Sequence, residues 1–156
     1  MSGELIRAAT SPDAVAQARA LFEAYAAQLG VSLCFQDFDR ELATLPGAYA
    51  PPRGGLWLAG DATAPCGCIA LRPLDGQDAE LKRLYVAPAA RGSGLGRRLT
   101  ETAIAHARAA GYRAIKLDTL AQMRSARALY ASLGFVPCAA YYHNPLGGTL
   151  YMQLTL

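Results

Sequence analysis

The chain has 156 residues, of which 53% are hydrophobic, and a formal net charge of +3 at pH 7. A chain of this length can bury roughly 70% of its unfolded surface, so it needs no metal or disulfide for stability. The basic stretches 82–98 and 108–127 have no interleaved aromatic stacking platform of the kind that binds nucleic acid. No apolar run reaches the roughly 18 residues of a membrane helix, and MSGELIRA is no signal pattern. Together these observations predict one cytoplasmic domain, residues 1–156, without nucleic-acid or membrane partners.

The first helix is the best-marked element of the N-terminal half. Ser11 is a favourable N-cap, and Pro12 suits the first helical position. Apolar residues then recur every three or four positions, as on a core-facing helix, until Gly30 ends it. The other elements predicted here are a strand at Glu4–Ala9, a helix at Gln36–Leu45, a loop at 48–55, and two antiparallel strands at Leu56–Ala59 and Cys66–Leu71.

Helices and strands alternate in the C-terminal half. The predicted elements are strands at Glu80–Val86, Ala114–Thr119, Phe135–Tyr142 and Gly148–Leu156, and helices at Gly94–Ala110 and Met123–Leu133. Gly111 and Gly134 follow the two helices as C-terminal glycines. Runs of strands followed by alternating elements predict an α/β fold, with a mixed, mostly antiparallel sheet and helices on both faces.

The most informative segment is LKRLYVAPAARGSGLGRRLTE at 81–101, which combines a strand, a glycine-rich loop and a helix start. The glycines of RGSGLG permit backbone conformations in which successive N–H groups converge on an anion. The N-terminus of the following helix adds a partial positive charge. Arg91, Arg97 and Arg98 add formal charge. The segment therefore predicts a phosphate-binding site.

Three phosphate-binding motifs can be compared with this loop. A nucleoside-triphosphate loop fails because no Lys follows the glycines, and Arg97 stands five residues after Gly92. The dinucleotide motif GxGxxG lacks its third glycine, although Asp118 stands near the position of a ribose-binding acid. The motif RxxGxG is matched in full by Arg91, Gly94 and Gly96.

RxxGxG is the pyrophosphate-binding motif of the GNAT superfamily of N-acetyltransferases, which this chain resembles from Glu80 to its C-terminus. LYVAPAARGSGLG is similar to that family's strand and loop, and ALYASLGF at 128–135 is similar to its next signature. The resemblance implies a GNAT-like acyl-CoA N-acyltransferase fold in which two strands splay and acetyl-CoA fills the gap. It also implies direct acetyl transfer to an amine in a ternary complex.

The resemblance assigns cofactor binding to the strand end and the loop. The residues concerned are Leu84, Tyr85, Val86, Arg91, Gly92, Ser93, Gly94, Leu95, Gly96 and Arg97. One position departs from the family pattern, because Met123 stands where many members carry Asn at the start of the second signature. The chain therefore lacks one polar cofactor contact of the family.

Three residues are candidates for the chemistry. The resemblance makes the Val86 N–H the donor to the oxyanion and Tyr130 the acid that protonates the thiolate; the alternative for Tyr130 is a core aromatic. A primary amine of pKa about 10.4 must also lose a proton, which costs roughly 4.6 kcal/mol at pH 7. Glu80 is the candidate base, on the face of Lys82, Leu84 and Val86 if no bulge intervenes. The alternatives are a solvated strand-end carboxylate at Glu80, or His143 as the base.

The acceptor is predicted to be a small polar amine. Tyr141, Tyr142 and His143 follow the acid-bearing helix and precede Pro145, which should turn the chain over the end of the sheet. Their polar tips are expected to line the acceptor side of the cleft. The alternative for these aromatics is a contact in a homodimer.

Two other points limit the function. The four cysteines, Cys34, Cys66, Cys68 and Cys138, lack the spacing of a zinc site and predict free thiols, so no metal is expected. The alternative functions are a non-catalytic acyl-CoA sensor and, less well matched, a dinucleotide-binding oxidoreductase. The intact Tyr130 argues against a sensor, and the missing third glycine argues against the oxidoreductase.

Overall fold

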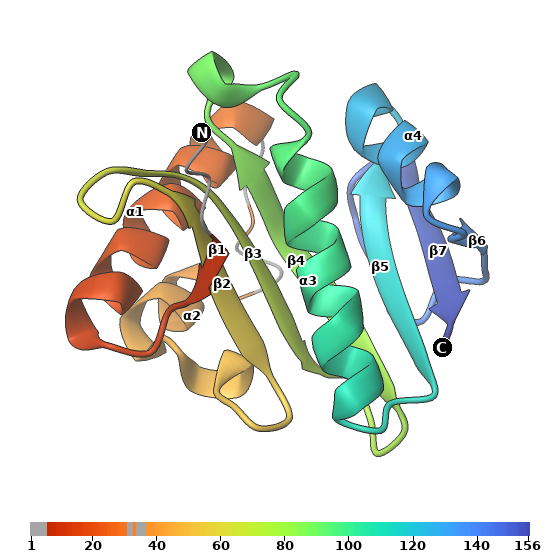
Figure 1. Cartoon of the computed structure of the whole chain (residues 1–156). Helices are drawn as coiled ribbons and strands as arrows, with labels where there is room; N and C mark the ends of the chain where they lie inside the picture. Colours follow the sequence, from red (N-terminus) through yellow and green to blue (C-terminus); the bar gives the residue numbers. More distant parts are fainter. Residues whose placement is uncertain (1–5, 31–32, 34–36) are drawn as a thin grey trace.

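The computed structural model describes residues 6–30, 33 and 37–156 (Figure 1). Within these residues, seven strands form one sheet in the order β1-β2-β3-β4-β5-β7-β6, in which only the β4–β5 pair is parallel. The strands are β1 (Ile6–Ala8), β2 (Gly55–Gly60), β3 (Pro65–Pro73), β4 (Asp78–Val86), β5 (Ala114–Leu120), β6 (Val136–Pro137) and β7 (Thr149–Thr155). The predicted mixed, mostly antiparallel sheet is confirmed.

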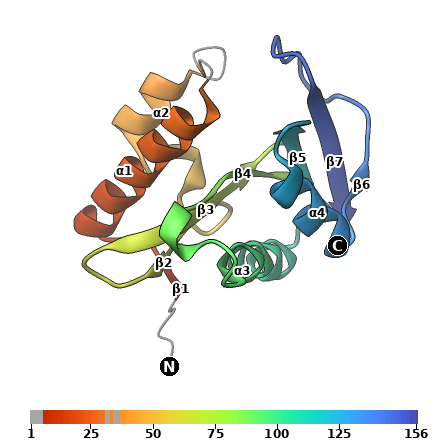
Figure 2. The same ribbon diagram turned by 90° about the horizontal axis from the view of Figure 1, so that it is seen from above.

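Helices cover both faces of the sheet, as predicted. They are α1 (Pro12–Leu29), α2 (Phe38–Thr44), α3 (Leu95–Ala109) and α4 (Arg124–Ser132). Helices α1 and α2 lie on one face, and α3 and α4 lie on the other (Figure 2). Ser11 caps α1 by accepting a hydrogen bond from the Ala14 N–H, and Gly30 ends that helix in the left-handed conformation.

Each face of the sheet has its own apolar core. On the α1 side, Phe22 is fully buried among residues of β2, β3 and β4, and its ring meets that of Tyr49 edge-on at 6.0 Å. On the α3 side, Leu95 and Leu99 pack against residues such as Leu81 of β4. The central strands are therefore buried on both faces, which holds them in a rigid frame.

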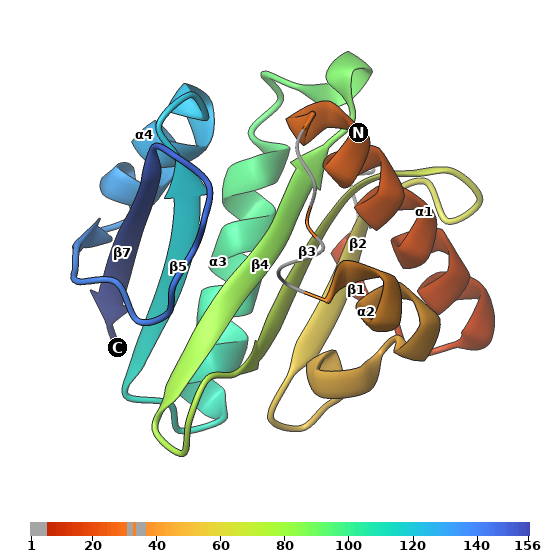
Figure 3. The ribbon, with the colours of Figure 1, turned by 180° about the vertical axis from the view of Figure 1, so that it is seen from behind.

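Strands β4 and β5 separate along their length. They pair only from Asp78 opposite Ala114 to Glu80 opposite Lys116, whereas β4 continues to Val86 and β5 to Leu120. The two strands diverge above this short paired region when the sheet is viewed from the α1 side (Figure 3). The predicted splay is thus present, and it leaves the backbone of the second half of β4 without a partner on the β5 side.

A β-bulge reverses the faces of β4 along its course. Lys82 pairs with Ala70 and Tyr85 pairs with Cys68, so one extra residue lies between these pairs on β4. Arg83, at the bulge, has φ +64°. The bulge therefore breaks the alternation on which the predicted common face of residues 80, 82, 84 and 86 depended.

The consequence is that β4 presents two different surfaces. Glu80 and Lys82 lie on the α1 side with Arg83, which pairs with Glu41 of α2. Leu84 and Val86 pack instead against the core on the α3 side. The prediction that Glu80 shares a face with Leu84 and Val86 is therefore wrong.

Other predicted boundaries differ in smaller ways. The strand expected at Phe135–Tyr142 is shorter, with its register against β7 limited to Val136–Pro137. One further hydrogen bond to β7 is donated by the Cys138 N–H to the Tyr151 carbonyl at 2.9 Å, and the chain then bends near Tyr141. The loop predicted at 48–55 overlaps a short 3-10 helix, η2 (Gly47–Tyr49). The first residues of the predicted Glu4–Ala9 strand and Gln36–Leu45 helix lie outside the described residues.

No helix within the described ranges is long and apolar enough to cross a bilayer.

Cys66, Cys68 and Cys138 are free thiols; Cys68 is buried, and the other two are half-buried. Cys34 lies outside the described residues.

Candidate active site

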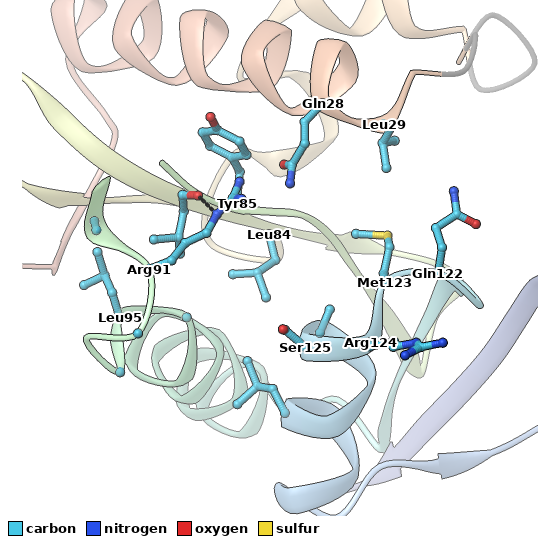
Figure 4. Close-up of a pocket in the computed structure, with 17 residues that line it drawn as sticks. Gln28, Leu29, Leu84, Tyr85, Arg91, Leu95, Gln122, Met123, Arg124 and Ser125 are labelled. Atoms are coloured by element: carbon cyan, nitrogen blue, oxygen red, sulfur yellow. Dashed lines mark hydrogen bonds between the residues drawn. The ribbon is translucent and has the colours of Figure 1, made fainter. Parts of the chain in front are cut away.

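A cavity of about 450 Å³ opens between the end of β4, the start of α3 and the start of α4 (Figure 4). It is lined by eight of the ten residues predicted to bind a cofactor: Leu84, Tyr85, Val86, Arg91, Gly92, Gly94, Leu95 and Gly96. Ser93 and Arg97 do not line it. The Ser93 hydroxyl donates to the Ala90 carbonyl at 2.6 Å, and the Arg97 guanidinium donates to the Ser132 hydroxyl at 2.6 Å.

Two glycines shape the loop between β4 and α3. Gly92 has φ +81° and Gly94 has φ +83°, a region of backbone space that favours glycine. Gly94 is the N-cap of α3 and supplies no side-chain cap, so the first N–H groups of the helix remain available at the cavity wall. Because a helix N-terminus carries a partial positive charge, this wall suits a phosphate group.

Arg91 holds the loop against the end of the strand. Its Nε donates to the Val86 carbonyl at 2.9 Å, the hydrogen bond drawn in the close-up (Figure 4). The amide of the same Val86 has a different direction. In an antiparallel pair, successive residues of a strand point their backbone N–H groups alternately toward the partner strand and away from it. The Ala87 N–H points toward β3, because it donates to the Cys66 carbonyl at 2.7 Å. The N–H of the preceding residue, Val86, therefore points away from β3 and toward the gap.

The opposite wall of the cavity was not found from sequence. Gln28 and Leu29 project from the end of α1, and Gln122, Arg124 and Ser125 come from the start of α4 (Figure 4). Met123, the N-cap of α4, adds an apolar thioether and no side-chain cap. A second helix N-terminus thus faces the cavity. The sequence signal that could have indicated this wall was the absence of a capping side chain at the start of α4.

A second, smaller cavity of about 30 Å³ lies in the same gap and is lined by residues from both faces of the sheet. It shares Leu84 and Met123 with the larger cavity. Tyr130 lines the smaller cavity, together with Tyr25, Lys82 and Asp118. Tyr130 is 7% exposed, and burial, followed by the charges of Tyr25 and Asp118, raises the pKa of its phenol. The phenol therefore stays protonated at neutral pH.

Glu80 is held in a network of donors. It is 1% exposed, so the alternative of a solvated strand-end carboxylate is wrong. Oε1 accepts a hydrogen bond from Arg72 Nε at 2.8 Å and forms an ion pair with the terminal nitrogen of the same guanidinium, also at 2.8 Å. Oε2 accepts a hydrogen bond from the Tyr141 hydroxyl at 2.6 Å. The predicted base and the predicted acceptor-side Tyr141 are thus in direct contact. Burial, followed by the Glu80 charge, raises the pKa of Tyr141.

Asp118 is the site carboxylate that sequence analysis did not assign to acyl transfer. Its Oδ2 accepts hydrogen bonds from the Tyr142 hydroxyl at 2.6 Å and from Asn144 Nδ2 at 3.2 Å. The predicted Tyr142 therefore reaches the same face as Tyr141. His143 does not, since it is exposed and its ring makes no hydrogen bond or ion pair with a described residue.

These features define a class of protein: an acyl-CoA N-acyltransferase fold, with a glycine loop and an uncapped helix start at the splay of two parallel strands. Residues 16–135 match the family model for the Acetyltransferase (GNAT) family. An uncharacterized N-acetyltransferase of Schizosaccharomyces pombe is 37% identical over 97% of this chain and 94% of the relative. The chain belongs to the GNAT family of acetyltransferases and is an acyltransferase.

Solved structures agree with this assignment. An acetyltransferase from Streptococcus agalactiae matches with a TM-score of 0.81 and 26% identity, covering 100% of both chains. An acetyltransferase from Salmonella typhimurium, solved with acetyl-CoA, matches with a TM-score of 0.74 and 24% identity, covering 99% of this chain and 94% of that chain. The second likeness is one of fold.

Proposed function

We propose that this protein transfers an acetyl group from acetyl-CoA to a primary amine of a small molecule, by direct attack in a ternary complex. The observation that carries the proposal is the cavity of about 450 Å³ that runs from the glycine loop to the gap beside Val86. It joins an anion-binding helix N-terminus to the smaller cavity that Tyr130 lines. Acetyl-CoA is the ligand in the Salmonella structure, which has the same fold.

The cofactor is assigned to the larger cavity. Its pyrophosphate would accept hydrogen bonds from the amides of residues 92–97, where the start of α3 offers free N–H groups. Its thioester would then lie between Leu84 and Met123, where the two cavities meet. No metal is part of this assignment.

Three groups of the chain take part in the proposed reaction. When the amine attacks, the carbonyl oxygen gains negative charge, and the Val86 N–H donates to it; one such donor is worth about 3 to 4 kcal/mol. Tyr130 donates its phenolic proton to the departing thiolate as that thiolate forms. Glu80 accepts the proton of the amine, and the Asp118 carboxylate on the same face is the alternative acceptor.

Release of free thiol from acetyl-CoA in the presence of an amine panel tests this function, with mass spectrometry of the product. We expect thiol release that depends on the amine, and a product heavier by one acetyl group. Tight acetyl-CoA binding without thiol release for any amine would support the non-catalytic sensor instead. The family assignment already removes the dinucleotide-binding oxidoreductase. A cytoplasmic location, a single domain over residues 1–156 and a homodimer remain predictions from sequence.

A further inference from the structure

Lys82 is a buried cation without a hydrogen bond. The residue is 6% exposed, and its ammonium lines the smaller cavity. The nearest carboxylate oxygens are Glu80 Oε2 at 3.7 Å and Asp118 Oδ1 at 3.9 Å, which attract it but lie beyond hydrogen-bonding distance. Among the described residues none accepts a hydrogen bond from this ammonium, so three N–H donors remain unused.

The other charges of this face are paired much more closely. Arg83 donates two hydrogen bonds to Glu41, at 2.9 and 2.8 Å, and Arg72 is bound to Glu80 at 2.8 Å. Asp118 Oδ2 already accepts two hydrogen bonds. Of the three cations of this cluster, Arg72, Arg83 and Lys82, Lys82 is thus the one without a hydrogen bond to a described residue. Burial lowers its pKa, and the Glu80 charge opposes that shift.

A buried ammonium with unused donors is unfavourable unless another group supplies acceptors. The cavity beside it, at about 30 Å³, is too small for a whole substrate. It exceeds the minimum of roughly 10 to 15 Å³ that one water needs, so it can hold a head group of one or two oxygen atoms. Its opening toward Leu84 and Met123 would leave the rest of such a molecule near the thioester position.

We propose that Lys82 binds a carboxylate of the acceptor, so that the substrate class is an amine with a carboxylate a few ångströms away, as in an α-amino acid. This inference rests on the proposed function and specifies its substrate. The carboxylate occupies the smaller cavity and accepts hydrogen bonds from the Lys82 ammonium. The amine of the same molecule then lies toward the gap, next to the Val86 amide and Tyr130.

The experiment compares matched acceptors and matched lysine variants. The acceptors are alanine, leucine and phenylalanine, each against its carboxamide, with kcat/KM expressed per neutral amine because the amine pKa values differ. The variants are Lys82→Met and, as a control, Lys116→Met, which removes a partly buried lysine of β5 that pairs with Asp78 at the start of β4. Acetyl-CoA affinity and thermal melting are measured for each variant.

We expect the parent enzyme to prefer the acids to the carboxamides. Lys82→Met should lower kcat/KM for the acids by about 10- to 100-fold, as expected for the loss of a charge-assisted hydrogen bond, with little change for the carboxamides. The loss should fall mainly on the acceptor KM, and acetyl-CoA affinity should not change. Lys116→Met should retain the parent preference.

Three outcomes would overturn the inference. Carboxamides or simple amines turned over as well as the acids would show that the carboxylate is not recognised, and the proposed acetyltransferase function would still stand. An equal loss for acids and carboxamides in a folded Lys82→Met variant would give Lys82 another role. No thiol release with any amine would remove the proposed function and, with it, this inference.

Discussion

The two sides of the β4–β5 gap are built in different ways. On the α3 side, one wall of the cavity comes from one continuous segment, Leu84–Gly96, which ends in the free N–H groups of a helix start. On the α1 side, the wall is a network of charged and phenolic side chains drawn from α2, β3, β4, β5 and the segment before β7. The first arrangement suits a constant ligand such as a pyrophosphate. In the second arrangement, single side-chain substitutions can alter which acceptor fits.

The largest effect is expected on the loop side, from Gly94→Val. The substitution puts a β-branched residue at φ +83° and projects its side chain into the cavity, so acetyl-CoA affinity should fall by more than about 100-fold. Calorimetric titration with acetyl-CoA measures it. Gly111→Val is the matched control, because Gly111 has φ +86°, has open space around it and lies at the other end of α3. Equal affinities for both variants would contradict the loop assignment.

The next effect tests the point where the two sides meet. Tyr130→Phe removes only the phenolic proton, so turnover should fall by about 10- to 100-fold while acetyl-CoA affinity stays the same. Tyr112→Phe is the control, since the buried Tyr112 donates a hydrogen bond to the Arg53 carbonyl away from the site. Unchanged turnover in Tyr130→Phe would show that Tyr130 is a core aromatic. The packing of its ring against that of Phe135, with the ring centroids 5.6 Å apart, is consistent with that alternative.

A smaller effect is expected on the side-chain face, from Glu80→Gln. If Glu80 accepts the amine proton, turnover should fall by about 10-fold at pH 7 and recover in part near pH 10, where the amine deprotonates unaided. The pH profile of kcat/KM measures this, with Asp118→Asn alongside. A loss that is uniform with pH would leave Glu80 as a positioning residue for Arg72 and Tyr141. Recovery in Asp118→Asn alone would transfer the role to Asp118.

The smallest effect is one of stability. Burial lowers the pKa of Lys82 in the folded protein, whereas the unfolded chain has a lysine pKa of about 10.4. Between those two values the unfolded state binds more protons, so the contribution of Lys82 to the free energy of unfolding rises with pH, by about 1.4 kcal/mol per pH unit at most. Below the lowered pKa, the fold carries the full cost of the buried ammonium.

Lys82→Met should remove that dependence. The free energy of unfolding of the variant, relative to the parent, should be highest near pH 7 and decline toward about pH 10. Urea unfolding across this range measures it, with Lys116→Met as the control. Parallel curves for Lys82→Met and the parent would show that Lys82 does not titrate differently in the folded state.

Much of the fold followed from local patterns. The cap at Ser11, the terminal glycines and the apolar periodicity placed the helices to within a few residues, because these signals act within one or two turns. The strand predicted at Phe135–Tyr142 was too long because the apolar pattern continues to Tyr142, whereas backbone hydrogen bonding to β7 extends only to Cys138. Strand pairing depends on a partner that lies elsewhere in the chain.

The sequence by itself determined the glycine loop, its helix start and the resemblance to the GNAT superfamily, because the residues involved are contiguous in the chain. Only the tertiary structure decided the other side of the gap. The bulge at Arg83 moves Glu80 and Lys82 to the α1 face, and Tyr141 meets Glu80 across 61 positions of sequence. A single extra residue reverses which face each later side chain occupies, so no local pattern could indicate which charges would meet there.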